Sequence, residues 1–343
     1  MTSGPSAESG PPADLGAAER WFVDHGLPYF VDGHRAAVAR GLRRPRLVAV
    51  FGLAVVLGAL GGVLLGAAVG GASGLGAGLT VAGVVLAAYA VATLRAWLIV
   101  GWAVRRTLRS LSFVLPLVTR ALPLLLLFIT FLFINAEVWQ VAASLDGGVL
   151  WVTVLLFAAI AVGFLLTRLP EELDDVDDEV EAAQLVDACT GTPLEVAARG
   201  LAARVDKVGA VDAEVAGLQK ANLVLVLLVA QAVQVLLLAL AVFAFFIVFG
   251  VVAMEPAVVG SWTGGPLHEL DGLLGDWAGE RLSLELIRVA TFLAAFSGLY
   301  FTVYAVTDEH YRRQFFSVVI HELERAVAAR VAYRALRDGR LAE

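Results

Sequence analysis

The chain has 343 residues, of which 59% are hydrophobic, and its mean hydropathy is +0.81. Soluble domains contain roughly 45–50% apolar residues, so this composition excludes a water-soluble globular protein. The formal net charge is −7, and the single cysteine, Cys189, excludes an intramolecular disulfide.

The N-terminal region has two parts of different composition. Residues 1–18 are small, polar and proline-containing, which is typical of a disordered tail. Residues 19–46 bring four aromatic rings close to a run of arginines, namely Trp21, Phe22, Tyr29 and Phe30. Aromatic side chains concentrate at membrane–water interfaces, so we expect this segment to lie at headgroup level on the cytoplasmic side.

Six apolar runs are long enough, or nearly so, to cross about 30 Å of hydrocarbon as helices. They cover residues 47–69, 77–99, 121–141, 149–167, 223–249 and 286–307. The sequence therefore predicts an all-α, polytopic helical membrane protein, with four helices in 47–167, two in 221–307, and an outer loop at about 250–285. Arginines flank alternate ends of these runs, and Arg281 and Arg288 are the exceptions. Short cytoplasmic loops are enriched in arginine, so both termini are expected to be cytoplasmic.

Glycine recurs every four residues through the first run and into the second, at Gly58, Gly62, Gly66, Gly70, Gly74 and Gly78. Residues four apart share one face of a helix, and glycines on that face let two backbones approach closely. The spacing predicts a tightly packed hairpin of the first two spans. Packing between subunits of a homo-oligomer is the alternative.

The third run carries polar residues near its end, at Asn135, Glu137 and Gln140. Charged side chains inside a membrane are costly and usually face a partner or a cavity. Counting 1.5 Å per residue, Glu137 comes close to the height of Arg288 in the sixth run. Three interpretations of Glu137 and Arg288 stay open: each side chain reaches the headgroups separately, the two form an ion pair that acts as a structural clasp, or they form a gate for a substrate or ion.

The fifth run carries two further polar residues, Gln231 and Gln234. Amide side chains within a membrane either hydrogen-bond to neighbouring helices or line a polar seam. We expect them to contribute to helix association.

Two segments outside the apolar runs have helical patterns. Residues 168–220 open with an acidic stretch and contain a capping box, with Thr192 as N-cap and Glu195 at the third helical position, which predicts a helical hairpin. Residues 308–343 place apolar side chains at spacings of three and four, which predicts an amphipathic cytoplasmic helix. Either segment could bind a cytoplasmic protein partner.

No arrangement of a nucleophile and a base, and no metal-binding motif, is present in the sequence. The His-Glu pairs at His268 and His321 lack the second histidine of a zinc-protease motif. We expect no catalytic residue, cofactor, metal or nucleic-acid partner. The leading hypothesis is a non-enzymatic scaffold or regulator in a bacterial inner membrane. An ion channel or transporter-like pore near Glu137 and Arg288 is the first alternative, and an intramembrane enzyme is the second.

Overall fold

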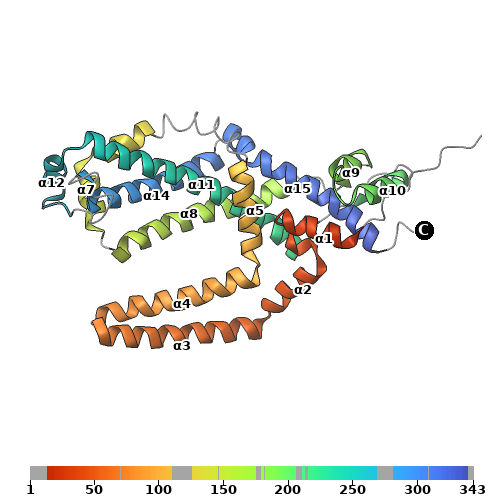
Figure 1. The fold of residues 1–343 in the computed structure, drawn as a ribbon, viewed down its shortest axis with the longest axis horizontal. Coiled ribbons are helices and arrows are strands. Elements are labelled where there is room, and N and C mark those ends of the chain that lie inside the picture. The colour runs from red at the N-terminus through yellow and green to blue at the C-terminus, as the bar shows by residue number, and fades with distance from the viewer. Residues whose placement is uncertain are drawn as a thin grey trace, which may run out of the picture. The chain divides into compact units, whose positions relative to one another are not determined.

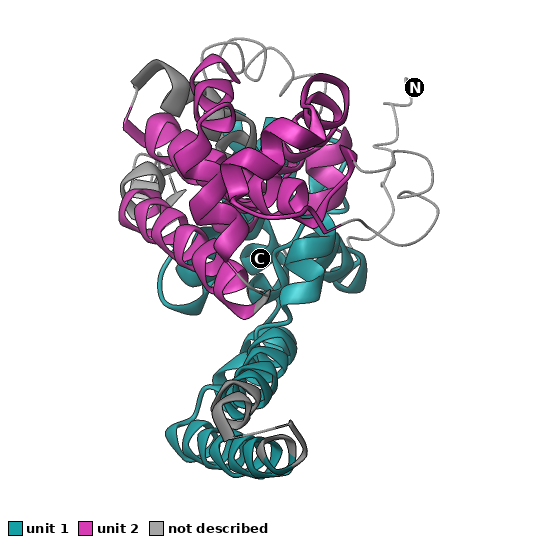
Figure 2. Cartoon of the chain, turned by 90° about the vertical axis from the view of Figure 1, so that its left-hand side faces the viewer, with its two compact units in different colours: residues 1–103, 176–226, 321–343 teal, residues 104–175, 227–320 magenta. Residues whose placement is uncertain are grey.

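The computed structural model divides into two compact units, which we describe separately (Figures 1 and 2). Unit 1 contains residues 1–103, 176–226 and 321–343, and unit 2 contains residues 104–175 and 227–320. The structure describes residues 14–69, 71–109, 126–145, 147–174, 179–180, 182–205, 211–212, 215–268, 281–307 and 309–338. Most of the N-terminal segment expected to be disordered lies outside these ranges.

Nearly all of the described elements are helices. Unit 1 contains α1 (Leu15–Asp24), η1 (Pro28–Phe30), α2 (Asp32–Gly41), α3 (Arg44–Val69), α4 (Gly71–Thr93), α9 (Ala182–Cys189) and α10 (Glu195–Val205). A two-residue antiparallel pair, β1 (Glu179–Val180) with β2 (Val211–Asp212), brackets α9 and α10. Unit 2 contains α7 (Ala136–Ser144), α8 (Gly147–Asp174), α12 (Pro256–Thr263) and α14 (Leu284–Thr307). Three helices belong to both units: α5 (Ala96–Arg109), α11 (Leu218–Ala253) and α15 (Glu309–Arg337).

Several helices have the length and hydropathy that a membrane span requires. Four of them lie within the described ranges: Arg44–Leu64 of α3, Gly148–Leu169 of α8, α11 and α14. Two bent pairs raise the number to six if each pair is one span, namely Gly78–Thr93 with α5, and Leu126–Phe133 with α7. The chain is therefore consistent with a helical membrane protein.

The second and third predicted spans are not single straight helices. The chain turns by 78° between α4 and α5, where Arg95 has a φ of 49°. It turns by 76° between Leu126–Phe133 and α7. Asn135 adopts an extended conformation there, and its side chain accepts a hydrogen bond from the backbone N–H of Glu137 at 2.8 Å. The apolar run gave no sign of this break, because a single asparagine is enough to cap the next helix. Its side chain binds the backbone N–H that the break leaves without a helical partner.

In unit 1, α3 and α4 form a closely packed antiparallel hairpin (Figure 1). A Cβ atom built on Gly58 would lie 2.7 Å from the carbonyl oxygen of Gly78, and one built on Gly78 would lie 3.5 Å from the Cα of Gly62. The contacts of Gly66, Gly70 and Gly74 lie outside what the structure describes. Gly58 and Gly78 therefore lie where the two backbones approach closely, and the role of the whole glycine series stays a prediction.

The rest of unit 1 is a helical module, which we define as α1, η1, α2, α9, α10, α11 up to Val226, and α15 from His321. Its core brings the two ends of the chain together: the ring of Phe22 lies 5.5 Å from the ring of Phe30 and 5.5 Å from that of Tyr333. Tyr29 is buried as well. Phe22, Tyr29 and Phe30 are thus buried within the module and do not face headgroups directly, and the level of this segment relative to the membrane stays a prediction.

Polar contacts fix the chain segments of the module to one another. The buried Asn222 side chain accepts from the N–H of Tyr29 at 2.9 Å and donates to the carbonyl of Gly26 at 3.1 Å. Arg325 donates to the carbonyls of Ala188 and Thr190 at 2.8 and 2.9 Å, which caps the end of α9. Helices α9 and α10 thus lie within residues 168–220, and the end of α9 is bonded to α15.

In unit 2, α14 is the most buried of the long helices. Its contact with α11 is close, because a Cβ atom on Gly250 would lie 2.4 Å from Leu286 and one on Gly298 would lie 3.3 Å from Val235. In contrast, α8 leaves large apolar side chains such as Val152 and Leu155 exposed. An apolar outer surface of this kind is what lipid requires.

Candidate functional site

The polar residues of the third predicted span do not form the expected ion pair. Arg288 donates from Nη1 to the carbonyl oxygen of Ala143, at the end of α7, at 2.6 Å. Glu137 is exposed at the beginning of the same helix, and no ion pair joins it to Arg288. The height comparison that suggested the pair assumed one straight helix through residue 141, and the bend at Asn135 removes that assumption. Gln140 is exposed on α7.

The two glutamines of α11 differ in burial. Gln231 is completely buried, whereas Gln234 is half-buried. They are three positions apart on one helix and so lie on neighbouring parts of its surface. Their predicted role in helix association stays a prediction.

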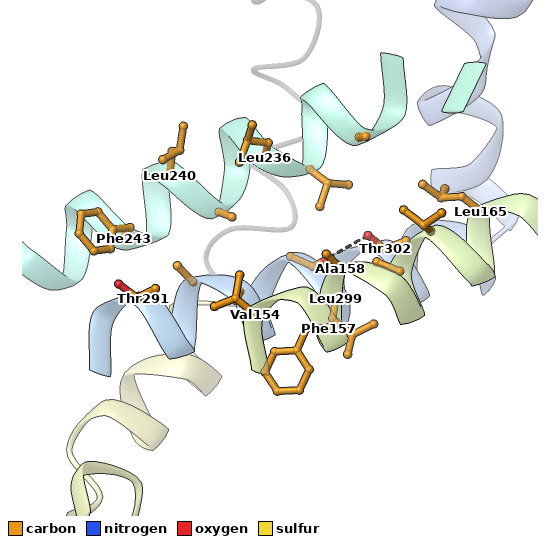
Figure 3. Close-up of a pocket in the computed structure, with 18 of the residues that line it drawn as sticks. Val154, Phe157, Ala158, Leu165, Leu236, Leu240, Phe243, Thr291, Leu299 and Thr302 are labelled. Carbon is orange, nitrogen blue, oxygen red and sulfur yellow. Dashed lines mark hydrogen bonds between the residues drawn. The ribbon is translucent and has the colours of Figure 1, made fainter. Parts of the chain in front are cut away.

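One cavity of unit 2 is apolar (Figure 3). It encloses about 540 Å³ between α8, α11 and α14, and side chains such as Phe157, Leu236 and Phe243 line it. Thr291 and Thr302 also line it, but their hydroxyls donate to the carbonyls of Ile287 and Gly298 in their own helix. None of the lining side chains, all of which lie in described parts of the three helices, carries a charge. The cavity suits a hydrocarbon chain, because it offers little to replace the water around an ion.

A cavity of opposite character lies in the helical module. It measures about 160 Å³, and we call it the arginine-lined cavity; its residues are Phe30, Arg35, Gln219, Arg330, Tyr333, Arg334 and Arg337. Arg330, Arg334 and Arg337 follow at intervals of four and three, so α15 presents them on one face. Helix α2 contributes Arg35, and the first turn of α11 contributes Gln219. Four guanidinium groups from two helices therefore surround one small space.

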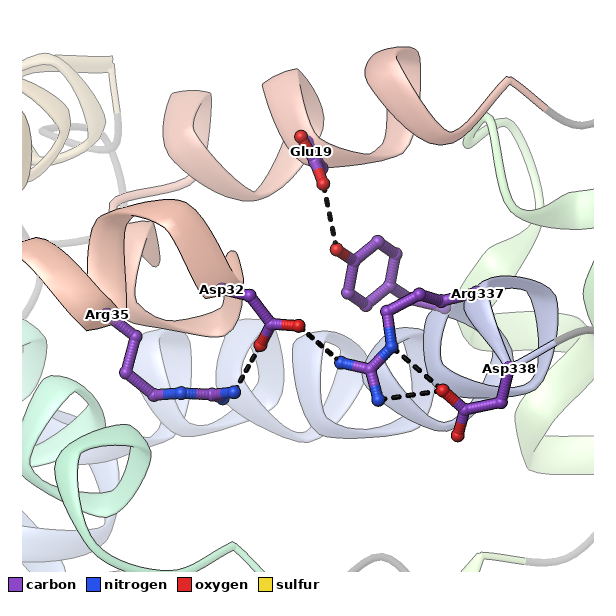
Figure 4. Close-up of polar contacts among 6 residues, drawn as sticks. Glu19, Asp32, Arg35, Arg337 and Asp338 are labelled. Carbon is purple, nitrogen blue, oxygen red and sulfur yellow. Dashed lines mark hydrogen bonds and ion pairs between the residues drawn. The ribbon is translucent and has the colours of Figure 1, made fainter.

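Carboxylates bind some of these arginines (Figure 4). Asp32 accepts from Arg35 through one oxygen and from Nη1 of Arg337, at 2.6 Å, through the other. Arg337 also donates to Asp338 at 2.8 Å. The hydrogen bond to Asp338, and then the charge of Asp32, raise the pKa of Arg337. Asp32 thus joins α2 to α15 through two of the arginines that line the cavity.

Tyr333, Arg330 and Arg334 line the same cavity and differ in burial. The phenol of Tyr333 donates to Glu19 at 3.0 Å, and burial together with this bond raises the pKa of Tyr333 to about 12. Arg330 is 94% buried, since only 6% of its surface is exposed. Arg334 is exposed and has no hydrogen-bond or ion-pair partner among the residues that the structure describes. Guanidinium groups in this number favour a ligand with phosphate or carboxylate oxygens, which they bind through paired N–H groups.

Among the described residues there is no cluster of histidine, cysteine and acidic side chains that could hold a metal ion. Cys189, the one thiol, is buried, and burial raises its pKa to about 12. A thiol in that state is a poor nucleophile.

Sequence reasoning missed this cavity, although part of the signal was present. The spacing of Arg330, Arg334 and Arg337 shows that one face of the last helix is basic, but nothing local shows that Arg35 and Gln219 lie opposite. Comparisons with protein-family models, with curated proteins and with solved structures found no match for this chain. Function has to be inferred from the geometry.

Proposed function

We propose that the chain is a six-span protein of a bacterial inner membrane that acts, without catalysis, as a regulator or scaffold through its helical module. The module itself supports this topology. Contacts between Phe22 and Tyr333, and between Asn222 and Tyr29, join the first residues, the middle of the chain and the last helix. These three segments must therefore lie on the same side of the membrane.

That requirement limits the number of spans. The chain must cross an even number of times between α2 and α9, and again between Val226 and His321. Helix α4 returns alongside α3, and the hydroxyl of Tyr89 bonds the carbonyl of Gly41 at 2.8 Å near the beginning of α3. The region from α5 to α9 then needs two crossings, so the bent segment Leu126–Ser144 must cross as α8 does. With α11 and α14 the total is six.

The distribution of arginine supports a cytoplasmic position for the module. Arginines before α3 and along α5 lie on the module's side in this topology, as do those of the arginine-lined cavity. On the other side of the membrane, Arg281 and Arg288 are the only arginines among the described residues. Because cytoplasmic loops retain positive charge, this distribution favours a cytoplasmic position for the module and both termini.

The observation that carries the functional proposal is the arginine-lined cavity, which is closed only when the N-terminal helices, the start of α11 and the end of α15 come together. Its volume of about 160 Å³ is below the 300–1,000 Å³ typical of drug-sized ligands but can admit a phosphoryl group. A phosphorylated anion bound there competes with Asp32 for Arg35 and Arg337. Occupancy of the cavity thereby alters the link between α2 and α15, which is the regulatory event.

The channel alternative receives less support from the geometry. The 540 Å³ cavity of unit 2 has no charged lining residue in the described helices, and its two threonine hydroxyls are already bonded to backbone carbonyls. A hydrated ion entering it would lose water without replacement, which costs several kcal/mol or more.

The proposal is tested by thermal unfolding of the full-length protein in detergent, followed with a dye that reacts with Cys189 when it becomes exposed. Pyrophosphate should raise the unfolding midpoint above the value in sodium chloride of equal ionic strength, because it binds the folded state. Arg334→Gln should abolish most of this increase. Arg40→Gln, a change of an exposed arginine on α2 outside the cavity, should retain it.

Equal midpoints in pyrophosphate and chloride would overturn the proposed ligand class. Equal loss in both variants would mean that the response is a general effect of charge. Ion flux through proteoliposomes that contain the purified protein would support the channel alternative instead.

A further inference from the structure

A second pocket lies at the open end of the α3–α4 hairpin, and it is independent of the proposed function. It occupies about 470 Å³ where α2, α3, α4 and the beginning of α5 meet. Arg46 comes from the first turn of α3, and Tyr89 and Thr93 come from the end of α4. If α3 and α4 cross the bilayer, this end of the hairpin lies at the membrane surface. We call this space the interfacial pocket.

Two positive charges line the interfacial pocket, from Arg46 and Arg95. Within the described ranges, neither guanidinium has a hydrogen-bond or ion-pair partner, and no acidic residue lines the pocket. Burial lowers the pKa of the nearby His34, the charge of Arg95 lowers it further, and the charge of Glu19 acts in the opposite direction. The pocket therefore attracts an anion.

Apolar and aromatic groups surround these charges. Trp97 lines the pocket and is half-exposed, while Tyr89 is held in place by its hydrogen bond to Gly41. Val50 lines the side towards the hairpin, and Leu47 is exposed one turn of α3 away. Tryptophan and tyrosine are enriched at the depth where lipid headgroups meet acyl chains. A soluble anion makes no use of these apolar contacts, but a phospholipid does.

The backbone at Arg95 indicates that its side chain is needed. Its φ of 49° lies in the left-handed region, which is strained for any residue other than glycine. A residue outside α4 and α5 stabilises the bend between them, because the hydroxyl of Tyr29 donates to the carbonyl of Leu94 at 2.7 Å. Glycine would remove this strain, and the chain has 34 glycines, yet arginine occupies the position. Strain retained in this way is common at binding sites.

We propose that the interfacial pocket binds the headgroup of an anionic phospholipid. Arg46 and Arg95 bind its phosphate oxygens, Trp97 and Tyr89 lie beside the glycerol region, and the acyl chains run along the exposed apolar surface of the hairpin. The chemistry shared with a free phosphate ion is the pair of guanidinium groups. The apolar walls select the lipid.

Binding is measured on the full-length protein in detergent, by native mass spectrometry and by thermal unfolding, with phosphatidylglycerol, phosphatidylcholine or inorganic phosphate added. Phosphatidylglycerol should stay bound and raise the unfolding midpoint, and the other two additives should not. Arg46→Gln should weaken this binding about tenfold, as expected for the loss of one charge-assisted hydrogen bond. Arg43→Gln is the matched control, since Arg43 is exposed just before α3 and does not line the pocket.

Arg95→Gly separates binding from folding. The variant should unfold at the same or a higher temperature without lipid, because backbone strain is relieved, and it should lose the increase that phosphatidylglycerol gives. Arg334→Gln should keep that increase, which distinguishes this pocket from the arginine-lined cavity.

Three results would overturn the proposal. Equal binding of phosphatidylcholine would show that the charge is not recognised. An equal response to inorganic phosphate would assign the pocket to a free anion. Equal weakening by Arg43→Gln and Arg46→Gln would show that only the general charge of this surface matters.

Discussion

Arg337, at the end of α15, donates from Nη1 to Oδ2 of Asp32 at 2.6 Å, although 305 positions separate the two residues in the chain. Exposed ion pairs contribute little to stability, typically about 0.2–1 kcal/mol. The ion pair between Arg337 and Asp32 therefore matters mainly for geometry. It joins α2 and α15, the two helices that supply the arginines of the cavity, and so links segments near the two ends of the chain.

The topology predicts that Val196 and Ser261 lie on opposite sides of the membrane. Both positions are exposed, on α10 and α12 respectively. In a Cys189→Ala background, an impermeant maleimide should label Ser261→Cys on intact cells and Val196→Cys only after permeabilisation. The native Cys189 is unsuitable as a probe, because it is buried and its pKa is raised to about 12. Labelling of Val196→Cys on intact cells would refute the assignment.

Asn222→Ala should destabilise the helical module by roughly 2–4 kcal/mol, since it leaves the buried N–H of Tyr29 and the carbonyl of Gly26 without their partner. The reaction of Cys189 with a thiol dye during heating reports the unfolding of the module. Gln140→Ala, which changes an exposed amide, should stay within about 0.5 kcal/mol. Similar midpoints for the two variants would show that the Asn222 contacts contribute little.

Gly58→Ala should destabilise the α3–α4 hairpin by about 1–3 kcal/mol, as overpacking of a tight contact does. The added methyl group would lie 2.7 Å from the carbonyl of Gly78 and 3.0 Å from Ala82. Gly52→Ala is the control in the same helix, because no atom lies within 4 Å of its added methyl group. Heating followed by size-exclusion chromatography measures the fraction that stays monodisperse. Equal losses for Gly58→Ala and Gly52→Ala would show that the close contact with α4 is not the reason for glycine at position 58.

The module should lose stability as the pH rises from about 9 towards 12. Burial raises the pKa of Cys189 from 9.0, and those of Tyr29 and Tyr333 from 10.0, to about 12 in each case. Above pH 9 the unfolded chain therefore releases protons that the folded chain keeps, so the free energy of unfolding falls. Unfolding midpoints between pH 7 and 11 should show this decline. Tyr333→Phe should make it shallower and Tyr300→Phe should not; a flat profile would contradict the argument.

Arg288→Gln should destabilise unit 2 by about 1.5–3 kcal/mol, which is typical for loss of a hydrogen bond from a charged group. The bond in question joins Nη1 of Arg288 to the carbonyl of Ala143. Glu137→Gln should have an effect below about 0.5 kcal/mol. A double-mutant cycle should show no coupling between the two positions. Coupling well above about 0.5 kcal/mol would restore the ion pair that the sequence suggested.

Much of the helical architecture follows from the sequence alone. Apolar runs identify helices α3, α8, α11 and α14, because a chain in lipid must satisfy its own backbone groups. Glycines at positions 58 and 78 likewise predict the approach of α3 to α4. Such features are local or periodic, and a single chain displays them directly.

The bends and the cavities do not follow from the sequence in the same way. Asn135 interrupts an apolar run by capping a helix, and composition barely changes there. Arg95 turns the chain with a backbone conformation that its residue type disfavours. The arginine-lined cavity depends on contacts between α2, α11 and α15, whose lining residues are more than 100 positions apart in the chain. Hydrophobic periodicity shows that such helices have a buried face but not what covers it.

The joining of distant segments in the helical module also determines when the protein can finish folding during its synthesis. Glu19 and its partner Tyr333 are 314 positions apart, a distance that a ribosome covers in roughly 15–60 s at about 5–20 residues per second. Throughout that interval Phe22 and Phe30 lack their final covering helix while every span is being inserted. The first helices made are thus the last to be buried, and a nascent chain that stalls before α15 exposes an aromatic surface that chaperones and proteases can recognise.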